Sequence, residues 1–149
     1  MEPRTGGARP ICVSRRARAA AAAAGALAVL AGCGGQVDTA GDVTVLVSAR
    51  TGAGMDALGS GPLSVVGGCL GLGGFVVVWP PGTDVVDEDP LRLEVPDLGT
   101  VGLGDPVRVA GGFVVQHAEG DEVREPGPVE VGGVTVPEPC AAHDVFLAH

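Results

Sequence analysis

The sequence of 149 residues contains no lysine, asparagine or tyrosine, and its aromatic residues are three Phe and one Trp. Without lysine, the chain cannot form the phosphate-binding loop that ends in Gly-Lys-Ser/Thr. With so few aromatic residues, a hydrophobic core must consist largely of valine and leucine. The apolar run Ala19–Leu30 would span about 18 Å as a helix, which is short of the roughly 30 Å hydrocarbon core of a bilayer. We therefore predict no permanent transmembrane helix.

Positive charge is scarce after the first part of the chain. Five of the nine arginines precede residue 19, and beyond Cys33 four arginines oppose 17 carboxylates, which gives a net charge of −13. Phosphate backbones are bound by Lys and Arg, so this composition excludes nucleic acid as an expected partner. It also disfavours contact with anionic lipid headgroups, so any attachment to a membrane has to overcome that repulsion.

The first 33 residues have the three-part layout of an export signal. Residues 1–18 carry five arginines, Ala19–Leu30 is uncharged, and two small residues precede Cys33. The segment Leu30-Ala31-Gly32-Cys33 resembles the lipobox of bacterial lipoproteins. An ordinary secretory signal with an incidental cysteine is the alternative.

The lipobox resemblance implies that the Cys33 thiol receives a diacylglyceryl group and that a dedicated signal peptidase removes residues 1–32. Two or three acyl chains, at about 0.8 kcal/mol per buried CH₂, anchor a protein durably where one chain does not. The expected location is thus the extracytoplasmic face of the cell membrane. The Sec route is the default, and Ser14-Arg15-Arg16 is also typical of twin-arginine export.

After the anchor cysteine, residues 33–41 are expected to form a flexible tether and residues 42–149 a small β domain. The apolar segments are short, rich in valine and separated by Gly and Pro at intervals of about eight to twelve residues, which is typical of a small sandwich or barrel. Strands are predicted at Val43–Ser48, Leu63–Val66, Phe75–Trp79, Leu91–Val95, Pro106–Ala110, Phe113–Gln116, Val129–Val136 and Val145–Ala148. No helix is predicted after residue 33, so the expected fold class is all-β.

Two cysteines, Cys69 and Cys140, remain in the mature domain once Cys12 leaves with the signal and Cys33 is lipidated. In an oxidising compartment they are expected to form a disulfide. Closing roughly 70 residues would contribute about 4 kcal/mol on the loop-entropy model. The alternatives are two free thiols, or a metal site with His143.

A second resemblance covers about residues 64–147. Its motifs are Gly68-Cys69-Leu70, Val78–Thr83, Gly104–Val107 and Gly111–Val114, closed by Cys140 and Val145-Phe146-Leu147. These segments are similar to small actinobacterial lipoproteins of uncharacterised function, which implies an OB-like or similar compact barrel. The resemblance implies no catalytic residues.

Few residues suggest chemistry. Gly52–Ala57 matches G-x-G-x-x-A, but Gly59, Gly61 and Pro62 interrupt the helix that a dinucleotide fold requires, so a Gly-rich loop is favoured. Asp84–Asp89 lacks the spacing of a calcium loop and is expected to be a solvated acidic turn. The acidic run Glu119–Glu125 and the three histidines, His117, His143 and His149, are expected at the surface. The serines Ser48, Ser60 and Ser64 stand outside any G-x-S-x-G motif.

Trp79, the only Trp, precedes a rigid Pro-Pro turn and is the candidate contact for a ligand or partner. The favoured alternative places Trp79 in the core with its indole N–H bonded to a carbonyl. The sequence thus predicts a membrane-anchored domain that acts as an envelope interaction or ligand-binding module, with no enzymatic activity, metal or cofactor. The alternatives are a metal-binding envelope protein that uses His117, His143 and the acidic turn Asp84–Asp89, or a minor envelope hydrolase.

Overall fold

The computed structural model describes residues 34–50, 55–117 and 127–149. The predicted signal peptide, the predicted lipidation site Cys33 and the acidic run Glu119–Glu125 lie outside these ranges. The elements below all belong to residues 32–149. In the described ranges, no helix is long and apolar enough to cross a membrane.

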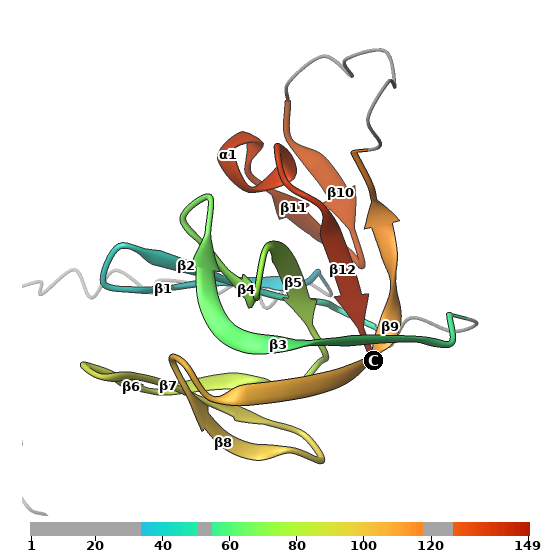
Figure 1. Cartoon of the computed structure of the whole chain (residues 1–149). Helices are drawn as coiled ribbons and strands as arrows, with labels where there is room; N and C mark the ends of the chain where they lie inside the picture. The colour runs from blue at the N-terminus through green and yellow to red at the C-terminus, as the bar shows by residue number, and fades with distance from the viewer. Residues whose placement is uncertain (1–33, 51–54, 118–126) are drawn as a thin grey trace, which may run out of the picture. The chain divides into compact units, whose positions relative to one another are not determined.

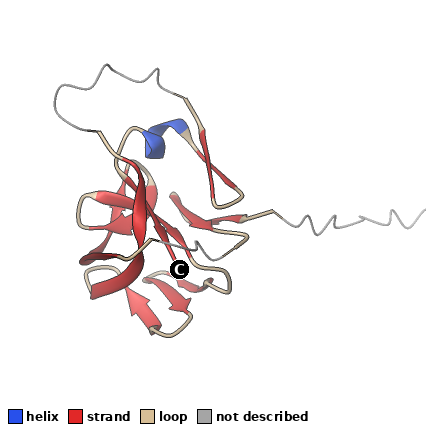
Figure 2. Ribbon diagram, turned by 90° about the vertical axis from the view of Figure 1, so that its right-hand side faces the viewer, coloured by secondary structure: helices blue, strands red, loops and turns tan. Residues whose placement is uncertain are grey.

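The described residues form twelve strands and one helical turn (Figures 1 and 2). The prediction of an all-β fold is therefore confirmed, although the helical turn was not predicted. The elements are β1 (Gln36–Ala40), β2 (Val43–Val47), β3 (Ala57–Val66), β4 (Cys69–Leu72), β5 (Phe75–Trp79), β6 (Asp84–Glu88), β7 (Leu91–Val95), β8 (Gly99–Gly102), β9 (Pro106–Val115), β10 (Val129–Val131), β11 (Val134–Val136), α1 (Glu138–Ala141) and β12 (Val145–Ala148).

Five strands pair in a closed circuit that runs β3-β4-β5-β12-β9 and returns to β3. All pairs are antiparallel except β5 with β12, which are parallel. The ten-residue strand β3 serves two neighbours, because residues 57–62 pair with β9 and residues 63–66 pair with β4. Strand β2 joins the end of β5 in parallel, and β1 pairs with β2 as an antiparallel hairpin.

Strand β5 is buried on both faces, which explains its continuous apolar sequence. Val77 and Trp79 belong to the inner cluster of the circuit, whereas Val76 and Val78 belong to an outer cluster. Strand β12 divides its side chains between the two clusters in the same way. Residues of β10, β11 and α1 complete the outer cluster, so the hairpin and the helical turn cover this face of the sheet (Figure 1). A strand covered on both sides loses the apolar–polar alternation of a half-exposed strand.

Strands β6, β7 and β8 form a separate three-stranded meander. Its central strand was predicted at Leu91–Val95, and its side chains alternate: Leu91, Leu93 and Val95 are buried in the inner cluster, and Arg92 and Glu94 are exposed. The meander therefore closes one side of the inner core with leucine and valine.

The prediction of a flexible tether over residues 33–41 is wrong for residues 36–40, which form β1. Strand β1 pairs with β2 from Gln36 opposite Val47 to Ala40 opposite Val43. The two-residue turn between them begins with Gly41 at φ 60°. A positive φ at this position gives a turn whose twist matches that of the paired strands, and glycine adopts it without steric cost. The segment was predicted as a tether because it is rich in small and polar residues, which do not indicate a strand.

Glycine positions explain most other differences. The predicted strands 106–110 and 113–116 are one strand, β9, which continues through Gly111 and Gly112. A Cβ at Gly111 would overlap the carbonyl oxygen of Leu147, so glycine lets β12 approach. Conversely, the predicted strand 129–136 is a hairpin, because Gly132 and Gly133 form its turn at φ 59° and 80°. Strand β4, the end strand β8 and the first half of β3 were not predicted, since their glycines suggested loops.

Candidate functional site

An open groove of about 660 Å³ lies where the meander meets the β3–β9 pair. Strand register sets one wall of the groove, because Ser60 stands opposite Arg108 and Pro62 opposite Pro106. Its lining residues come from β3, β9, β8 and the turn before β8: Ser60, Gly61, Pro62, Leu98, Val101, Pro106, Val107 and Arg108.

The groove combines an apolar surface with two polar side chains. Leu98 is 42% exposed and Pro62 and Pro106 are exposed, so apolar atoms are available to a ligand. The guanidinium of Arg108 and the hydroxyl of Ser60 supply hydrogen-bond donors, and the arginine supplies positive charge. An apolar surface with a few convergent polar groups is the usual character of a ligand site.

The prediction of Trp79 as a contact for a partner is wrong, because its side chain is 0% exposed. The strand that carries Trp79 is buried on both faces, so no face of the residue reaches solvent. The main-chain carbonyl of Trp79 accepts hydrogen bonds from the N–H and Oγ of Ser48 at 2.9 and 3.1 Å. In the described part of the chain, the indole Nε1 has no hydrogen-bond partner. The core location is thus correct, but the expected bond from the indole to a carbonyl is absent there.

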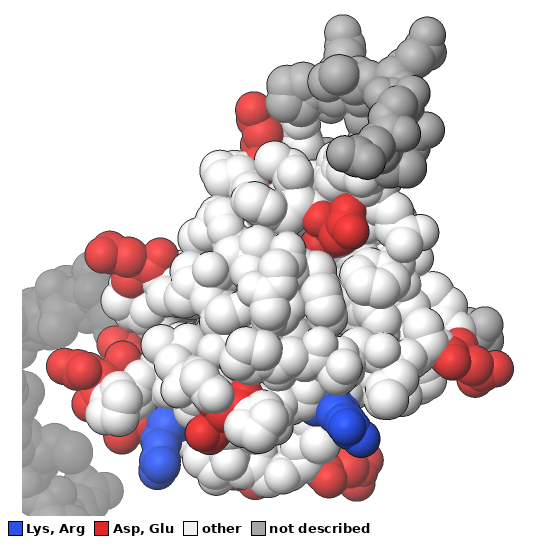
Figure 3. Space-filling model, viewed as in Figure 1, with Lys and Arg blue, Asp and Glu red and all other residues white. Residues whose placement is uncertain are grey.

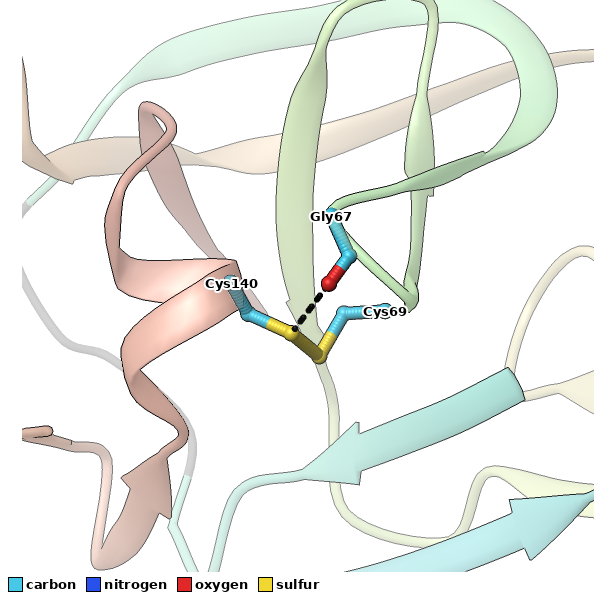
Figure 4. Close-up of a disulfide and its surroundings, with 3 residues drawn as sticks. All are labelled: Gly67, Cys69 and Cys140. Carbon is cyan, nitrogen blue, oxygen red and sulfur yellow. Dashed lines mark hydrogen bonds between the residues drawn. A yellow bond between two sulfur atoms is a disulfide. The ribbon is translucent and has the colours of Figure 1, made fainter. Parts of the chain in front are cut away.

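Cys69 and Cys140 form a disulfide with a Cα–Cα distance of 5.8 Å, as predicted (Figure 4). The bond ties α1 to β4 and so fastens the cover of the outer cluster to the sheet. Sγ of Cys140 also lies 3.4 Å from the carbonyl oxygen of Gly67. A disulfide sulfur carries no hydrogen to donate, so this is a packing contact. The alternatives of free thiols or a metal site with Cys140 are wrong, because both sulfurs are bonded to each other.

His117 is held beside the end of α1. Its main-chain N–H donates to Asp144 Oδ1 at 2.8 Å, and its ring Nε2 lies 3.0 Å from the Ala141 carbonyl oxygen. Since a carbonyl only accepts, Nε2 must carry the proton in this hydrogen bond. Within residues 34–50, 55–117 and 127–149, no three His, Cys, Asp or Glu side chains are grouped as metal ligands.

The acidic segment Asp84–Asp89 was predicted as a solvated turn; its exposure is confirmed, but the turn is wrong because residues 84–88 form strand β6. Its pairing with the alternating strand β7 puts it in a sheet, and its residues are largely exposed. The start of the G-x-G-x-x-A motif at residues 52–54 lies outside the described residues. Ala57, the last residue of that motif, begins strand β3, where a dinucleotide fold has a helix.

The serines of the domain are separated in the structure. Ser48 Oγ donates to the Trp79 carbonyl and Ser64 Oγ donates to the Gly73 carbonyl, while Ser60 lines the groove. Among the described residues, no serine hydroxyl is hydrogen bonded to a histidine.

No protein-family model, curated protein or solved structure matches this chain. The groove is therefore assigned from its own geometry. The sequence did not predict the groove, although the alternation in Val107-Arg108-Val109 agrees with the exposure of Arg108 between two buried valines. The missing information was spatial: the sequence does not reveal that Leu98 and Val101 lie beside the β3–β9 pair.

Proposed function

We propose that this chain is an exported lipoprotein, held on the extracytoplasmic face of the cell membrane by lipid on Cys33, whose β domain binds an envelope ligand or partner through the groove. The positive segment 1–18, the apolar run Ala19–Leu30 and the lipobox-like segment ending at Cys33 support export and lipidation.

The observation that carries export is the disulfide between Cys69 and Cys140. Disulfides persist in oxidising compartments and are rare in the cytosol. Both cysteines are nearly inaccessible, at 0% and 2% exposure, so the bond is part of the core. A core built around a disulfide favours folding outside the cytoplasm.

The surface charge argues for a partner that is not polyanionic. Among the described residues, thirteen carboxylates oppose three arginines. Figure 3 shows acidic side chains spread over the visible face, with few basic ones. A negative surface repels nucleic acids and other polyanions and favours a neutral or mainly apolar ligand.

The cover of the sheet buries one possible ligand surface, so within the described part of the chain we propose the groove as the ligand surface. We infer that the five-stranded circuit is OB-like, and OB folds commonly bind oligomers on the face of their second and third strands. Here the second and third strands of the circuit are β4 and β5, whose outer face is buried beneath β10, β11 and α1. The groove on β3 and β9 favours an apolar ligand or peptide segment with a carboxylate that Arg108 can bind.

Lipidation is tested by replacing Cys33 with Ser in the full chain and following incorporation of labelled fatty acid. We expect loss of the label and release of the protein from the membrane fraction. Equal labelling and equal membrane retention of the variant would refute the anchor.

The groove is tested by photo-cross-linking in intact cells. A photoreactive amino acid replaces Ser60 in the groove or, as a matched control, Val65, which is exposed on the same strand. We expect a cross-linked species from position 60 that is absent from position 65 and weakened by Arg108→Glu. Identical results from both positions, including no product from either, would contradict a binding function of the groove.

A further inference from the structure

The first strand begins very close to the proposed lipid. Strand β1 starts at Gln36, so only Gly34 and Gly35 separate it from Cys33. The N–H of Gly35 donates to the carbonyl oxygen of Gly133 at 2.7 Å, in the turn between β10 and β11. The fixed part of the chain thus begins two residues after the cysteine.

The backbone at Gly35 fits tightly between two elements. A Cβ at this position would lie 2.6 Å from the Val47 carbonyl oxygen and 2.7 Å from Val134 Cβ. A Cβ at Gly34 would meet only the Gly133 oxygen, at an ordinary 3.7 Å. Gly35 is therefore packed between the end of β2 and the β10–β11 turn, whereas Gly34 is exposed.

We propose that the domain docks directly on the lipid surface in one orientation, an inference that rests on the proposed lipidation of Cys33. Two residues span at most about 7 Å, so the lipid must enter the bilayer next to Gly35. The docking surface, here called the anchor end, consists of Gly34–Val37, Ala49–Arg50 and Gly132–Gly133. The partner of this surface is the phospholipid headgroup layer.

The charge of the anchor end suits this contact. It contains Arg50 and no carboxylate, although the described residues carry thirteen carboxylates in all. The nearest acids along the chain are Asp38 and Glu130, and Asp38 accepts a hydrogen bond from Gln36 Nε2 at 2.7 Å. Asp42 lies at the opposite end of the β1–β2 hairpin. Anionic headgroups therefore repel the anchor end less than the acid-bearing surfaces.

Tryptophan quenching tests the orientation. Val37→Trp and Val65→Trp place a fluorophore at positions of similar exposure, 50% and 45%, and β3 is separated from β1 by two strands in the sheet order. The native Trp79 is buried and gives a common background that the unsubstituted protein measures. Each full-length protein is produced with its leader and reconstituted in vesicles of phosphatidylethanolamine and phosphatidylglycerol that contain headgroup-spin-labelled lipid.

We expect at least threefold stronger quenching at position 37 than at position 65. A flexible Gly-Ser insertion of 12 residues between Gly34 and Gly35, with a mean span of roughly 19 Å, should remove most of that difference. Equal quenching at both positions, or an insertion without effect, would overturn the docking inference.

The mass of the mature protein is measured first, so that failure of the anchor is recognised separately. A product without lipid on Cys33 would refute the proposed lipoprotein and the docking inference with it. A lipidated product that shows no orientation would refute the docking inference alone.

Discussion

Removal of the disulfide should cost the domain much of its stability. We consider the double variant Cys69→Ala/Cys140→Ala, which opens a loop with a sequence separation of 71 residues. The chain-entropy model assigns about 4.4 kcal/mol to a loop of this length. Domains are stable by only about 5 to 15 kcal/mol, so the variant should lie near the threshold of unfolding.

The assay is urea unfolding followed by the fluorescence of Trp79, which is fully buried and is the only Trp of the chain. The reduced unsubstituted protein is the control, because it loses the cross-link while it keeps both sulfurs. We expect a loss of about 4 kcal/mol in the reduced protein and a similar or slightly larger loss in the variant. A loss below roughly 1 kcal/mol in both would refute the entropic argument.

The loss of stability on removal of the disulfide should also differ between parts of the domain. The bond fastens α1 to β4, and α1 has only four residues to hold it in place. Hydrogen exchange should therefore show earlier opening of β10, β11 and α1 than of the β3–β9 pair. Uniform loss of protection in the variant would contradict the role of the bond as a fastener of this cover.

Three further substitutions test the packing by urea unfolding followed by far-ultraviolet circular dichroism, because Trp79→Phe removes the only Trp of the chain. Gly71→Ala should destabilise the domain by about 3 kcal/mol, because the added Cβ would overlap the Phe75 carbonyl oxygen. The control Gly74→Ala places its Cβ in open space and should change stability by less than about 1 kcal/mol. Equal effects of the two substitutions would disprove the close approach of the strands at Gly71. Trp79→Phe should lower the free energy of unfolding by less than about 2 kcal/mol. The substitution removes an N–H that is buried without a partner, and this gain offsets part of the cost of the cavity. A loss above about 4 kcal/mol would show that the N–H is satisfied. Phe146→Ala should lower the free energy of unfolding by about 3 to 5 kcal/mol. The Phe146 ring is fully buried, and its centroid lies 5.1 and 5.7 Å from those of two other Phe rings. A loss under about 1 kcal/mol would contradict that packing.

The sequence predicted those strands whose chemistry is local. Phe75–Trp79, Leu91–Val95 and Val145–Ala148 match the structure residue by residue, because uninterrupted or alternating apolar residues are visible without a partner. Strand β4 was missed because its central residue, Gly71, looks like a loop residue. Position 71 requires glycine because a Cβ there would overlap the Phe75 carbonyl oxygen of the neighbouring strand, and no local sequence pattern reveals this contact.

The candidate sites also differ in whether the local sequence reveals them or whether they depend on contacts between strands. The disulfide was predicted by counting the cysteines that remain once the predicted signal peptide and the predicted lipidation site are set aside. Trp79 was proposed as a surface contact because a Pro-Pro turn follows it, and its burial depends on strands that pack on both faces of β5. The groove requires the register that sets Ser60 opposite Arg108, and this register is a product of the long strands β3 and β9.

The two proposed surfaces are built from different elements. The anchor end belongs to β1, β2 and the β10–β11 turn, whereas the groove belongs to β3, β8 and β9. No residue is shared, so the proposed contact with the membrane would leave the proposed ligand groove unoccupied. If Cys33 carries lipid as proposed, a connection of only two residues would also restrict the rotation of the domain and so the direction in which the groove faces. A partner would then be recognised at a defined height and direction above the membrane, which is the physical advantage of a domain fastened at Gly35 over one on a long tether.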